Sequence, residues 1–266
     1  MTWLKRSNEP AELKAVREAQ LPILRGLPGV PKSDDIKGYR VVSGKLWKSQ
    51  YLKCCYCEAK IPESFNDVEH FRPKATANRL PGCSSDHGYW WLAFTWTNLL
   101  YSCPGCNRIS KGILFPLGDG SQGALAEAEE FHSEVPLLLD PYEHSHVAHI
   151  EYRFVRLKDG GRWYARPRKR SQCGSYTIKT LGLNRSELLE LRQDHYEVNL
   201  VGLLADFKKV MDSKCAEDIR IAQVKLSRLF GVRAVFSSFS YDVLVQNFPN
   251  EIMEKFGCSW PNPTDL

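Results

Sequence analysis

The sequence predicts an α+β protein with a small metal-stabilised core, a β-hairpin and a mainly helical C-terminal region. Three observations support this prediction. Two Cys-x-x-Cys pairs occur in the first half of the chain. Residues 148–166 alternate between apolar and polar side chains around an Asp-Gly-Gly turn. After Ser171, apolar residues recur at helical spacing. We therefore expect a helical arm at 1–45, the core at 46–135, and the hairpin with its following helices at 136–266.

The N-terminal arm is expected to begin with a short helix over residues 11–19, because Pro10 suits the first turn of a helix. The Pro- and Gly-rich residues 21–31 predict a loop, and residues 39–53 are again expected to be helical. The first residues lack the apolar stretch and cleavage site of a secretion signal. No run approaches the ~18 apolar residues of a membrane span. We therefore expect a cytoplasmic protein.

The composition is that of an ordinary globular protein, with 43% hydrophobic and 25% charged residues and a net charge of +5. A chain of 266 residues holds one large domain or two small ones. Nine cysteines in a chain without a secretion signal favour metal binding and free thiols over disulfides. The cysteines expected as free thiols are Cys55, Cys83, Cys173, Cys215 and Cys258.

The two cysteine pairs predict a zinc site. They read Cys54-Cys55-Tyr56-Cys57 and Cys103-Pro104-Gly105-Cys106. Two such knuckles supply the four thiolates of a tetrahedral zinc ion and leave no open position for water, so the zinc is expected to be structural. The expected ligands are Cys54, Cys57, Cys103 and Cys106. Cys55 is a competing ligand because of its tighter spacing to Cys57, and four buried core thiols are the plainer alternative.

A pair of chemically active residues, Glu69 and His70, lies between the knuckles, and Asn107 directly follows the second knuckle. An imidazole can take a proton from water, while carboxylate and amide oxygens are hard ligands for a divalent ion. Neighbouring residues of an ideal strand point to opposite sides, so Glu69 and His70 serve one site only if the strand bends. The pattern favours metal-dependent hydrolysis of phosphodiesters.

The run from Cys54 to Pro116 resembles the HNH endonucleases. The matching motifs are Cys-x-Tyr-Cys-Glu, Glu-His-Phe-Arg-Pro-Lys, Tyr-Trp-Trp-Leu-Ala-Phe, Trp-x-Asn-Leu, Cys-x-x-Cys-Asn and Phe-Pro. They are similar to a branch that includes the nuclease subunit of Septu-type and retron-linked anti-phage defence systems, which works with an ATPase. Two later segments also resemble that branch, Pro136-Leu137-Leu138-Leu139-Asp140-Pro141 and Leu181-Gly182-Leu183-Asn184-Arg185.

The resemblance implies a zinc-stabilised ββα-metal core. In that core His70 matches the general base, and Glu69 and Asn107 match the ligands of a catalytic Mg²⁺ or Mn²⁺. The family more often carries Asp at the position of Glu69, and many relatives carry His at that of Asn107. Asn98 matches a structural residue whose amide bonds the backbone across a loop and keeps His70 oriented.

Two basic residues near these motifs are candidates for neutralising the charge of the reacting phosphate. Lys111 lies four residues after Asn107, on the same helix face, and Arg72 lies two residues after His70. A solvated surface charge is the alternative for each.

The hairpin region carries the predicted nucleic-acid surface. Eight basic residues and one acidic residue lie between Arg153 and Arg170, with Trp163 and Tyr164 among them. Basic clusters with interleaved aromatic residues suit a phosphate backbone, although a solvated hairpin face is an equal alternative. The candidates are Arg162, Arg166, Arg168, Lys169 and Arg170.

The remaining elements are a loop at 81–88, an aromatic helix at 89–96 that is expected to pack the zinc core, and C-terminal helices. We expect one long helix with Asn184 as its N-cap, and others at 216–229 and 241–247. No Walker A loop occurs, so any ATPase must be another subunit. The resemblance supplies an ABC-like ATPase, and residues 184–247 are its expected docking surface.

Together these inferences predict an HNH endonuclease that cuts DNA, with double-stranded DNA as the expected substrate, and that is the effector of an anti-phage system. Two alternatives stay open. One is a zinc-knuckle module that binds nucleic acid or protein without cutting. The other is a stand-alone restriction-type nuclease, which would be expected to carry a recognition domain such as a helix-turn-helix.

Overall fold

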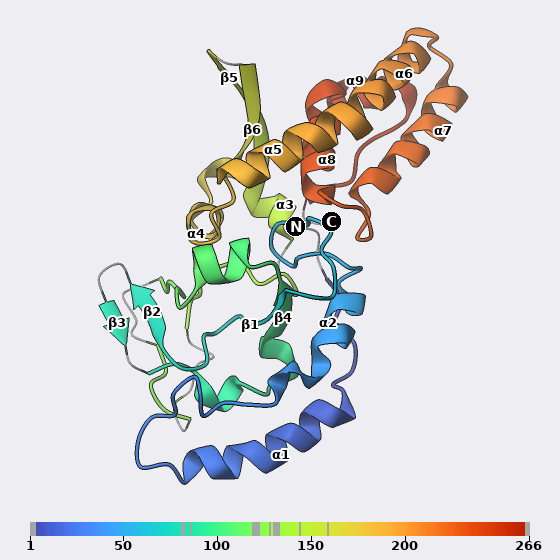
Figure 1. Ribbon diagram of the computed structural model, residues 1–266. Coiled ribbons are helices and arrows are strands. Elements are labelled where there is room, and N and C mark those ends of the chain that lie inside the picture. Colours follow the sequence, from blue (N-terminus) through green and yellow to red (C-terminus); the bar gives the residue numbers. More distant parts are fainter. Residues whose placement is uncertain are drawn as a thin grey trace.

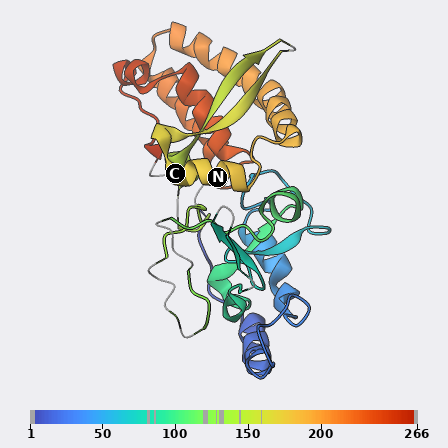
Figure 2. The ribbon, with the colours of Figure 1, turned by 90° about the vertical axis from the view of Figure 1, so that its left-hand side faces the viewer.

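The computed structural model describes residues 4–80, 83–85, 87–118, 123–127, 129, 134–143, 145–158 and 160–263. The chain folds into two lobes, one formed by its first half and the other by its second half (Figures 1 and 2). The described residues form a mixed α+β fold with small two-stranded sheets and many helices, as the sequence predicts. None of the described helices combines the length and the apolar character needed to cross a membrane.

The first lobe is built around one antiparallel strand pair. Strand β1 (Asp67–His70) pairs with β4 (Leu99–Ser102), and the π-helix η4 (Gly105–Lys111) follows β4. Helix α2 (Ser43–Ser49) packs on both strands, and α1 (Ala11–Arg25) lies at the far end of the lobe (Figure 1). Helix α1 extends beyond the predicted range because buried Leu24 fastens its last turn to the core.

A second small hairpin was not expected. Strand β2 (Ala77–Leu80) pairs with β3 (Cys83–Ser85), and β3 lies within residues 81–88, for which the sequence predicted a loop. Pro81 and Gly82, which suggested that loop, lie outside the described residues. The aromatic stretch after it forms two 3₁₀ turns, Trp90–Leu92 and Trp96–Asn98, instead of a helix. Most of its rings are buried, so the expected packing role is confirmed.

The second lobe wraps helices around the predicted β-hairpin. Strand β5 (Ile150–Leu157) pairs with β6 (Gly160–Pro167), and the helices are α3 (His146–His149), α4 (Gln172–Thr180), α5 (Ser186–His195), α6 (Val201–Asp212), α7 (Ala216–Leu226), α8 (Ser237–Asn247) and α9 (Asn250–Met253). Helix α8 is the centre of this lobe. The ring of Phe239 lies 5.5 Å from that of Tyr152 and 5.3 Å from that of Trp163.

The predicted start of α5 differs by one residue. Arg185 is the residue before the helix, and the side chain of Asn184 instead bonds the backbone of Ala165 in β6, donating to its carbonyl at 2.9 Å and accepting from its N–H at 2.8 Å. Asn184 therefore attaches the hairpin to the helices and does not cap α5.

Buried polar contacts join the two lobes. The carboxylate of Glu58, next to the first cysteine pair, accepts hydrogen bonds from the hydroxyls of Ser237 (2.6 Å) and Ser238 (2.8 Å) at the start of α8. The backbone N–H of Ser238 donates to the same carboxylate at 3.1 Å. Because the first turn of a helix has unsatisfied N–H groups, a carboxylate at this place stabilises α8. The first lobe thus supplies part of the cap of the central helix of the second.

Both ends of the described chain fasten to one segment between the lobes. The N–H of Leu4 donates to the carbonyl of Pro141 at 2.9 Å, and the hydroxyl of Ser145 donates to the carbonyl of Pro263 at 2.7 Å.

Candidate metal centre and active site

The two cysteine pairs meet in space. The sulfur atoms of Cys54, Cys57, Cys103 and Cys106 all lie within 4.8 Å of one another, and three of the four residues are buried. The sulfurs of Cys57 and Cys103 are 3.9 Å apart. A tetrahedral zinc ion with Zn–S bonds of ~2.3 Å places its sulfurs about 3.8 Å apart. The cluster therefore fits a metal ion such as zinc.

The structure also distinguishes between Cys54 and Cys55, the two candidate zinc ligands of the first knuckle. Cys54 belongs to the cluster and Cys55 does not. The Cys55 thiol is buried near Arg6, Tyr142 and Glu69, and burial raises its pKa well above the ordinary value. Because its sulfur lies outside the cluster, Cys55 is assigned as a buried core cysteine.

An arginine from the second lobe contacts the cluster. Nη2 of Arg185 lies 3.4 Å from Sγ of Cys106 and 3.9 Å from Sγ of Cys103. Four thiolates around one zinc ion carry a net negative charge, so a guanidinium beside them is electrostatically favourable. A Cβ on Gly105 would come within 2.9 Å of this guanidinium, so a larger residue there would displace the Arg185 side chain from the cluster.

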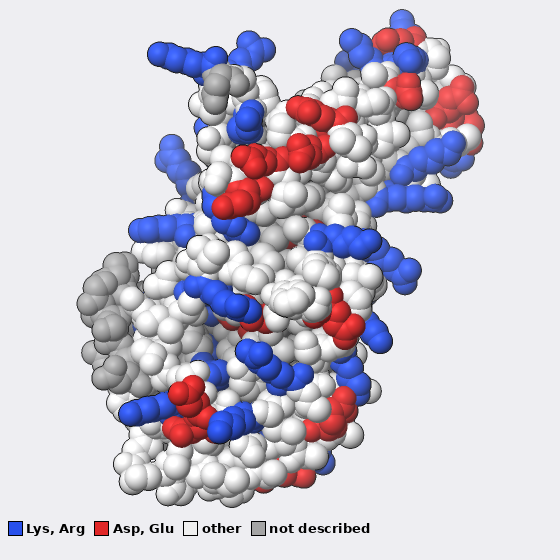
Figure 3. All heavy atoms as spheres, viewed as in Figure 1, with Lys and Arg blue, Asp and Glu red and all other residues white. Residues whose placement is uncertain are grey.

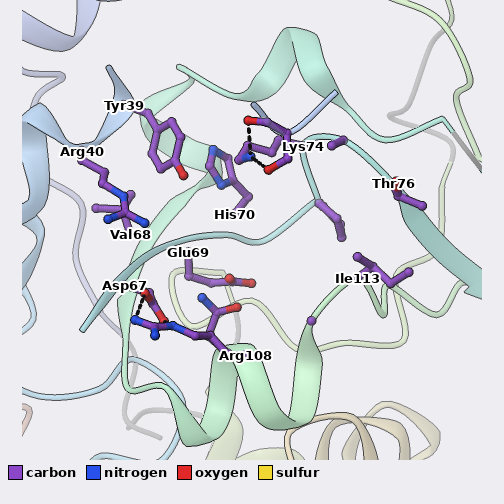
Figure 4. A pocket seen from close by; sticks show the side chains of 15 residues that line it. Tyr39, Arg40, Asp67, Val68, Glu69, His70, Lys74, Thr76, Arg108 and Ile113 are labelled. Atoms are coloured by element: carbon purple, nitrogen blue, oxygen red, sulfur yellow. Dashed lines mark hydrogen bonds and ion pairs between the residues drawn. The ribbon is translucent and has the colours of Figure 1, made fainter. Parts of the chain in front are cut away.

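The second knuckle also positions Asn107. Cys103 directly follows β4, and η4 begins at Gly105 and carries both Cys106 and Asn107. The N–H of Asn107 donates to the carbonyl of Cys103 at 3.0 Å. Two antiparallel strands followed by a helix therefore place Asn107 opposite β1, which carries Glu69 and His70. All three line one cavity of about 410 Å³. Glu69 and His70 are labelled in the view of this cavity in Figure 4.

Glu69 forms a buried ion pair with Lys111. Nζ of Lys111 lies 2.6 Å from Oε1 of Glu69, and the two side chains are 0% and 5% exposed. Burial raises the pKa of the Glu69 carboxyl, and Lys111 opposes that rise. Nζ of Lys111 also donates to the carbonyl of His70 at 3.0 Å. Lys111 does not line the cavity, so it holds the carboxylate in place and is not positioned to meet a phosphate.

The ring of His70 is held at one nitrogen. Nε2 lies 3.0 Å from the carbonyl oxygen of Ala93. Because a carbonyl only accepts hydrogen bonds, Nε2 carries the proton and Nδ1 keeps its lone pair. Nδ1 has no hydrogen-bonding partner among the described residues. Burial lowers the pKa of His70 to about 3, which keeps the imidazole neutral at neutral pH.

The side chain of Asn98 bonds the backbone of Arg72, two residues after His70, and that of Leu92, the residue before Ala93. Its side-chain oxygen accepts from the N–H of Arg72 at 2.8 Å, and its amide nitrogen donates to the carbonyls of Arg72 (3.1 Å) and Leu92 (3.2 Å). These are backbone contacts of the kind that the resemblance implied. The Arg72 side chain leaves the site, because its Nε donates to buried Glu134 at 3.0 Å. Like Lys111, Arg72 does not line the cavity.

Other cationic residues line the cavity instead, and none of them was among the predicted site residues, although Lys74 ends the Glu-His-Phe-Arg-Pro-Lys motif. They are Arg40, Lys74 and Arg108. Arg108 makes two hydrogen bonds of 2.8 Å to the carboxylate of Asp67 (Figure 4). Arg108 lies next to Asn107 on η4, and this adjacency to a predicted site residue could have identified it from the sequence. Arg40 lies in the N-terminal arm, outside every motif.

The basic residues of the hairpin do not form one surface. Arg166, Lys169 and Arg170 are exposed. Arg168 is only 16% exposed because it is paired with Asp242 of α8, lies 3.7 Å from Glu151, and donates to the carbonyl of Val147 at 2.6 Å. The assignment of Arg168 to nucleic-acid binding therefore needs correction, since its charge is already neutralised inside the protein.

Arg162 has a local contact as well. Its Nη1 donates to the carbonyl of Gly161 at 2.8 Å, and the side chain is half-buried. Figure 3 shows Lys and Arg side chains across both lobes with acidic groups between them. This face therefore carries no continuous basic stripe, and nucleic-acid binding by the hairpin stays a prediction.

Comparison with known proteins finds similarity to Septu proteins. The chain is 40% identical over 146 residues to Septu protein PtuB of Bacillus mycoides (strain KBAB4), covering 53% of this chain and 45% of that protein. It is 32% identical over 109 residues to Septu protein PtuB of Bacillus thuringiensis, covering 40% of this chain and 36% of that protein.

A third similar protein carries a different name. Septu protein PtuA of Bacillus mycoides (strain KBAB4) is 28% identical over 145 residues, which cover 54% of this chain and 19% of that protein. The chain thus spans less than half the length of each of these relatives. No family model and no solved structure matches it.

Proposed function

We propose that this chain is an HNH-type endonuclease that hydrolyses DNA phosphodiester bonds with Mg²⁺ or Mn²⁺. One observation carries the proposal: Glu69, His70 and Asn107 lie on a strand–strand–helix unit and line one cavity. A carboxylate and an amide are hard oxygen donors that suit these ions. When bound, the ion would supply positive charge to the reacting phosphate and its leaving oxygen.

His70 is the proposed general base. Its Nδ1 has the free lone pair needed to accept a proton from the attacking water, and the bond from Nε2 to Ala93 fixes the tautomer. The imidazole is neutral at neutral pH, which is the form that accepts a proton. Glu69 and Asn107 would hold the catalytic ion, and Lys111 keeps the Glu69 carboxylate in place.

The cysteine cluster has a structural role in this proposal. Four thiolates complete the coordination of zinc and leave no position for water or substrate. The cluster lies at the start of η4, and Asn107 is the residue after Cys106. Zinc would therefore fix the helix that carries Asn107.

We infer further that the chain acts in anti-phage defence with an ABC-like ATPase. The similarity to two PtuB proteins and the motif order of that branch support this role. The second lobe has exposed apolar residues that suit a protein contact, with Val198 at 80%, Val224 at 59% and Ile221 at 45% exposure. Replacing Val198 and Val224 by Asp should abolish co-purification with a co-expressed ABC-like ATPase of a Septu-type system, and unchanged co-purification would remove this surface from the assignment.

The nuclease proposal is tested by replacing His70 with Ala. Loss of a general base lowers the rate by about 10²–10⁴. Plasmid nicking in Mg²⁺ or Mn²⁺ gives the rate, while metal analysis and circular dichroism confirm that zinc and fold are kept. Wild-type protein that binds DNA without cutting would favour the non-catalytic zinc module. Wild-type-like cutting by the variant would remove His70 from the mechanism.

A further inference from the structure

One wall of the cavity comes from a segment outside the strand–strand–helix unit. Residues 33–42 belong to the connection between α1 and α2, and three of them, Ser33, Tyr39 and Arg40, line the cavity together with Glu69 and His70. Figure 4 labels Tyr39 and Arg40 among the lining residues. The sequence placed this stretch in a separate N-terminal arm. The polar side chains of this segment therefore lie beside the proposed general base.

The backbone of this segment is fixed on α1. Gly38 has φ +91, a left-handed conformation that glycine adopts easily, and it precedes the 3₁₀ turn Tyr39–Val42. A Cβ at Gly38 would lie 2.9 Å from a methyl group of Val16 in α1. Val42, at the end of the turn, is fully buried. Tyr39 and Arg40 are thus presented from an anchored turn.

Tyr39 contacts the ring of His70 directly. Their ring centroids are 4.6 Å apart with an interplanar angle of 73°, an edge-to-face arrangement (Figure 4). The hydrogen bond to Ala93 fixes one corner of the imidazole, and Tyr39 restricts its remaining rotation. Nζ of Lys74 lies 5.5 Å from the centre of the Tyr39 ring and donates to Oγ of Ser33 at 2.6 Å.

Arg40 differs from the other cations that line the cavity. Lys74 is bonded to Ser33, and Arg108 is paired with Asp67. Arg40 is exposed, and its guanidinium has no hydrogen bond or ion pair with any of the described residues. It lies close enough to Lys74 to lower the pKa of that side chain, after burial as the larger cause. An anion that enters the cavity would meet Arg40 without breaking an existing pair.

We propose that residues 33–42 complete the active site, with Arg40 binding a phosphate of the nucleic-acid strand and Tyr39 positioning the imidazole of His70. The proposal rests on the proposed nuclease function. A guanidinium presents several N–H groups in one plane, which matches the oxygens of a phosphate. Tyr39 acts through His70 and is a positioning residue.

The two assignments predict different kinetic effects. Arg40→Ala should weaken DNA binding and raise KM about 10-fold, since hydrogen bonds to charged groups contribute on that scale. The slope of log affinity against log salt should fall by about 0.9, and kcat should stay close to wild type. Tyr39→Leu should lower kcat about 10- to 100-fold without weakening binding, because a displaced base reacts slowly. Tyr39→Phe keeps the ring and should keep the rate.

Fluorescence anisotropy with a labelled duplex in buffer without added Mg²⁺ or chelator measures binding, and cleavage of the same duplex in Mg²⁺ gives kcat and KM. Lys37→Ala is the matched control, because Lys37 is exposed on the same segment and does not line the cavity. Arg40→Ala and Tyr39→Leu variants that both behave like this control overturn the proposal. If wild type binds the duplex but never cuts it, the nuclease function fails and the Tyr39 assignment fails with it, while the binding arm still decides Arg40.

Discussion

Replacing Lys111 with Met removes the only cation that the structure places against the buried Glu69 carboxylate among the described residues. The two charged groups are 2.6 Å apart, and neither side chain is more than 5% exposed. Methionine is similar in length and apolar, so it fills the space without restoring the charge. The same change deletes the hydrogen bond from Nζ to the carbonyl of His70. The substitution therefore tests what the ion pair with Glu69 contributes to the stability of the protein.

The magnitude follows from the geometry. At 2.6 Å and an effective dielectric constant of about 20, the gross attraction is about 6 kcal/mol, but burying both ions offsets most of it. The measurable quantity is the cost of leaving one buried charge alone, about 3–5 kcal/mol. For a chain of this size about 1 kcal/mol shifts Tm by 2–4 °C, so we expect Tm to fall by about 6–20 °C.

The loss should depend on pH in a defined direction. Burial raises the pKa of Glu69 above its ordinary value of 4.5, and without Lys111 the rise is larger. The folded variant then holds a proton that the unfolded chain has released, so its stability falls as pH rises above the unfolded pKa. The deficit relative to wild type should be smaller near pH 5 than near pH 8.

Urea unfolding followed by circular dichroism measures the loss. Lys209→Met is the control, because its ion pair with Asp206 is 78% and 72% exposed and should contribute less than about 1 kcal/mol. Adding Glu69→Gln to Lys111→Met should recover much of the stability, since no buried charge is left alone. A single variant as stable as the Lys209 control, at either pH, would refute the buried pair as described.

Three further predictions use other parts of the molecule. Cys54→Ser should lose its bound zinc and unfold the first lobe, whereas Cys55→Ser should keep zinc at one ion per chain by elemental analysis; the reverse result would exchange the two ligands. Neutralising Arg166, Lys169 and Arg170, the exposed basic residues after Tyr164, should lower the slope of log DNA affinity against log salt by about 0.9 for each lost phosphate contact. An unchanged slope would place these residues outside the interface. Burial raises the pKa of Asp242 to about 6, so this group lowers stability as pH rises from about 4 to 6, and Asp242→Asn should remove that fall in urea unfolding curves.

Local patterns predicted much of the fold. The cysteine spacing anticipated the cluster, and the alternation of residues 148–166 anticipated β5 and β6. The N-cap of α5 was misplaced because the amide of Asn184 bonds β6 instead. A side chain that can cap a helix can equally bond a distant strand, and only the tertiary structure decides between them.

The candidate site was harder to predict where the direction of a side chain depends on a partner far away in the sequence. Motif order placed Glu69, His70 and Asn107 together, and they do line one cavity. The direction of a basic side chain is not encoded locally. Arg72 turns toward Glu134, which lies 62 residues away in sequence, and Lys111 turns inward to Glu69. Residues 33–42 carry no motif, and they reach the site because the turn Tyr39–Val42 packs on α1 while α2 packs on β1 and β4.

The contacts between the lobes have a consequence for the newly made chain. The cysteine cluster forms from residues that leave the ribosome well before α8, and Glu58 and Arg185 both meet their partners beside that cluster. A chain without the proposed zinc ion would lack the metal bonds that fix the loop contacted by Glu58 and Arg185. Such chains would expose apolar helix faces to proteases, so metal capture would act as a checkpoint during synthesis.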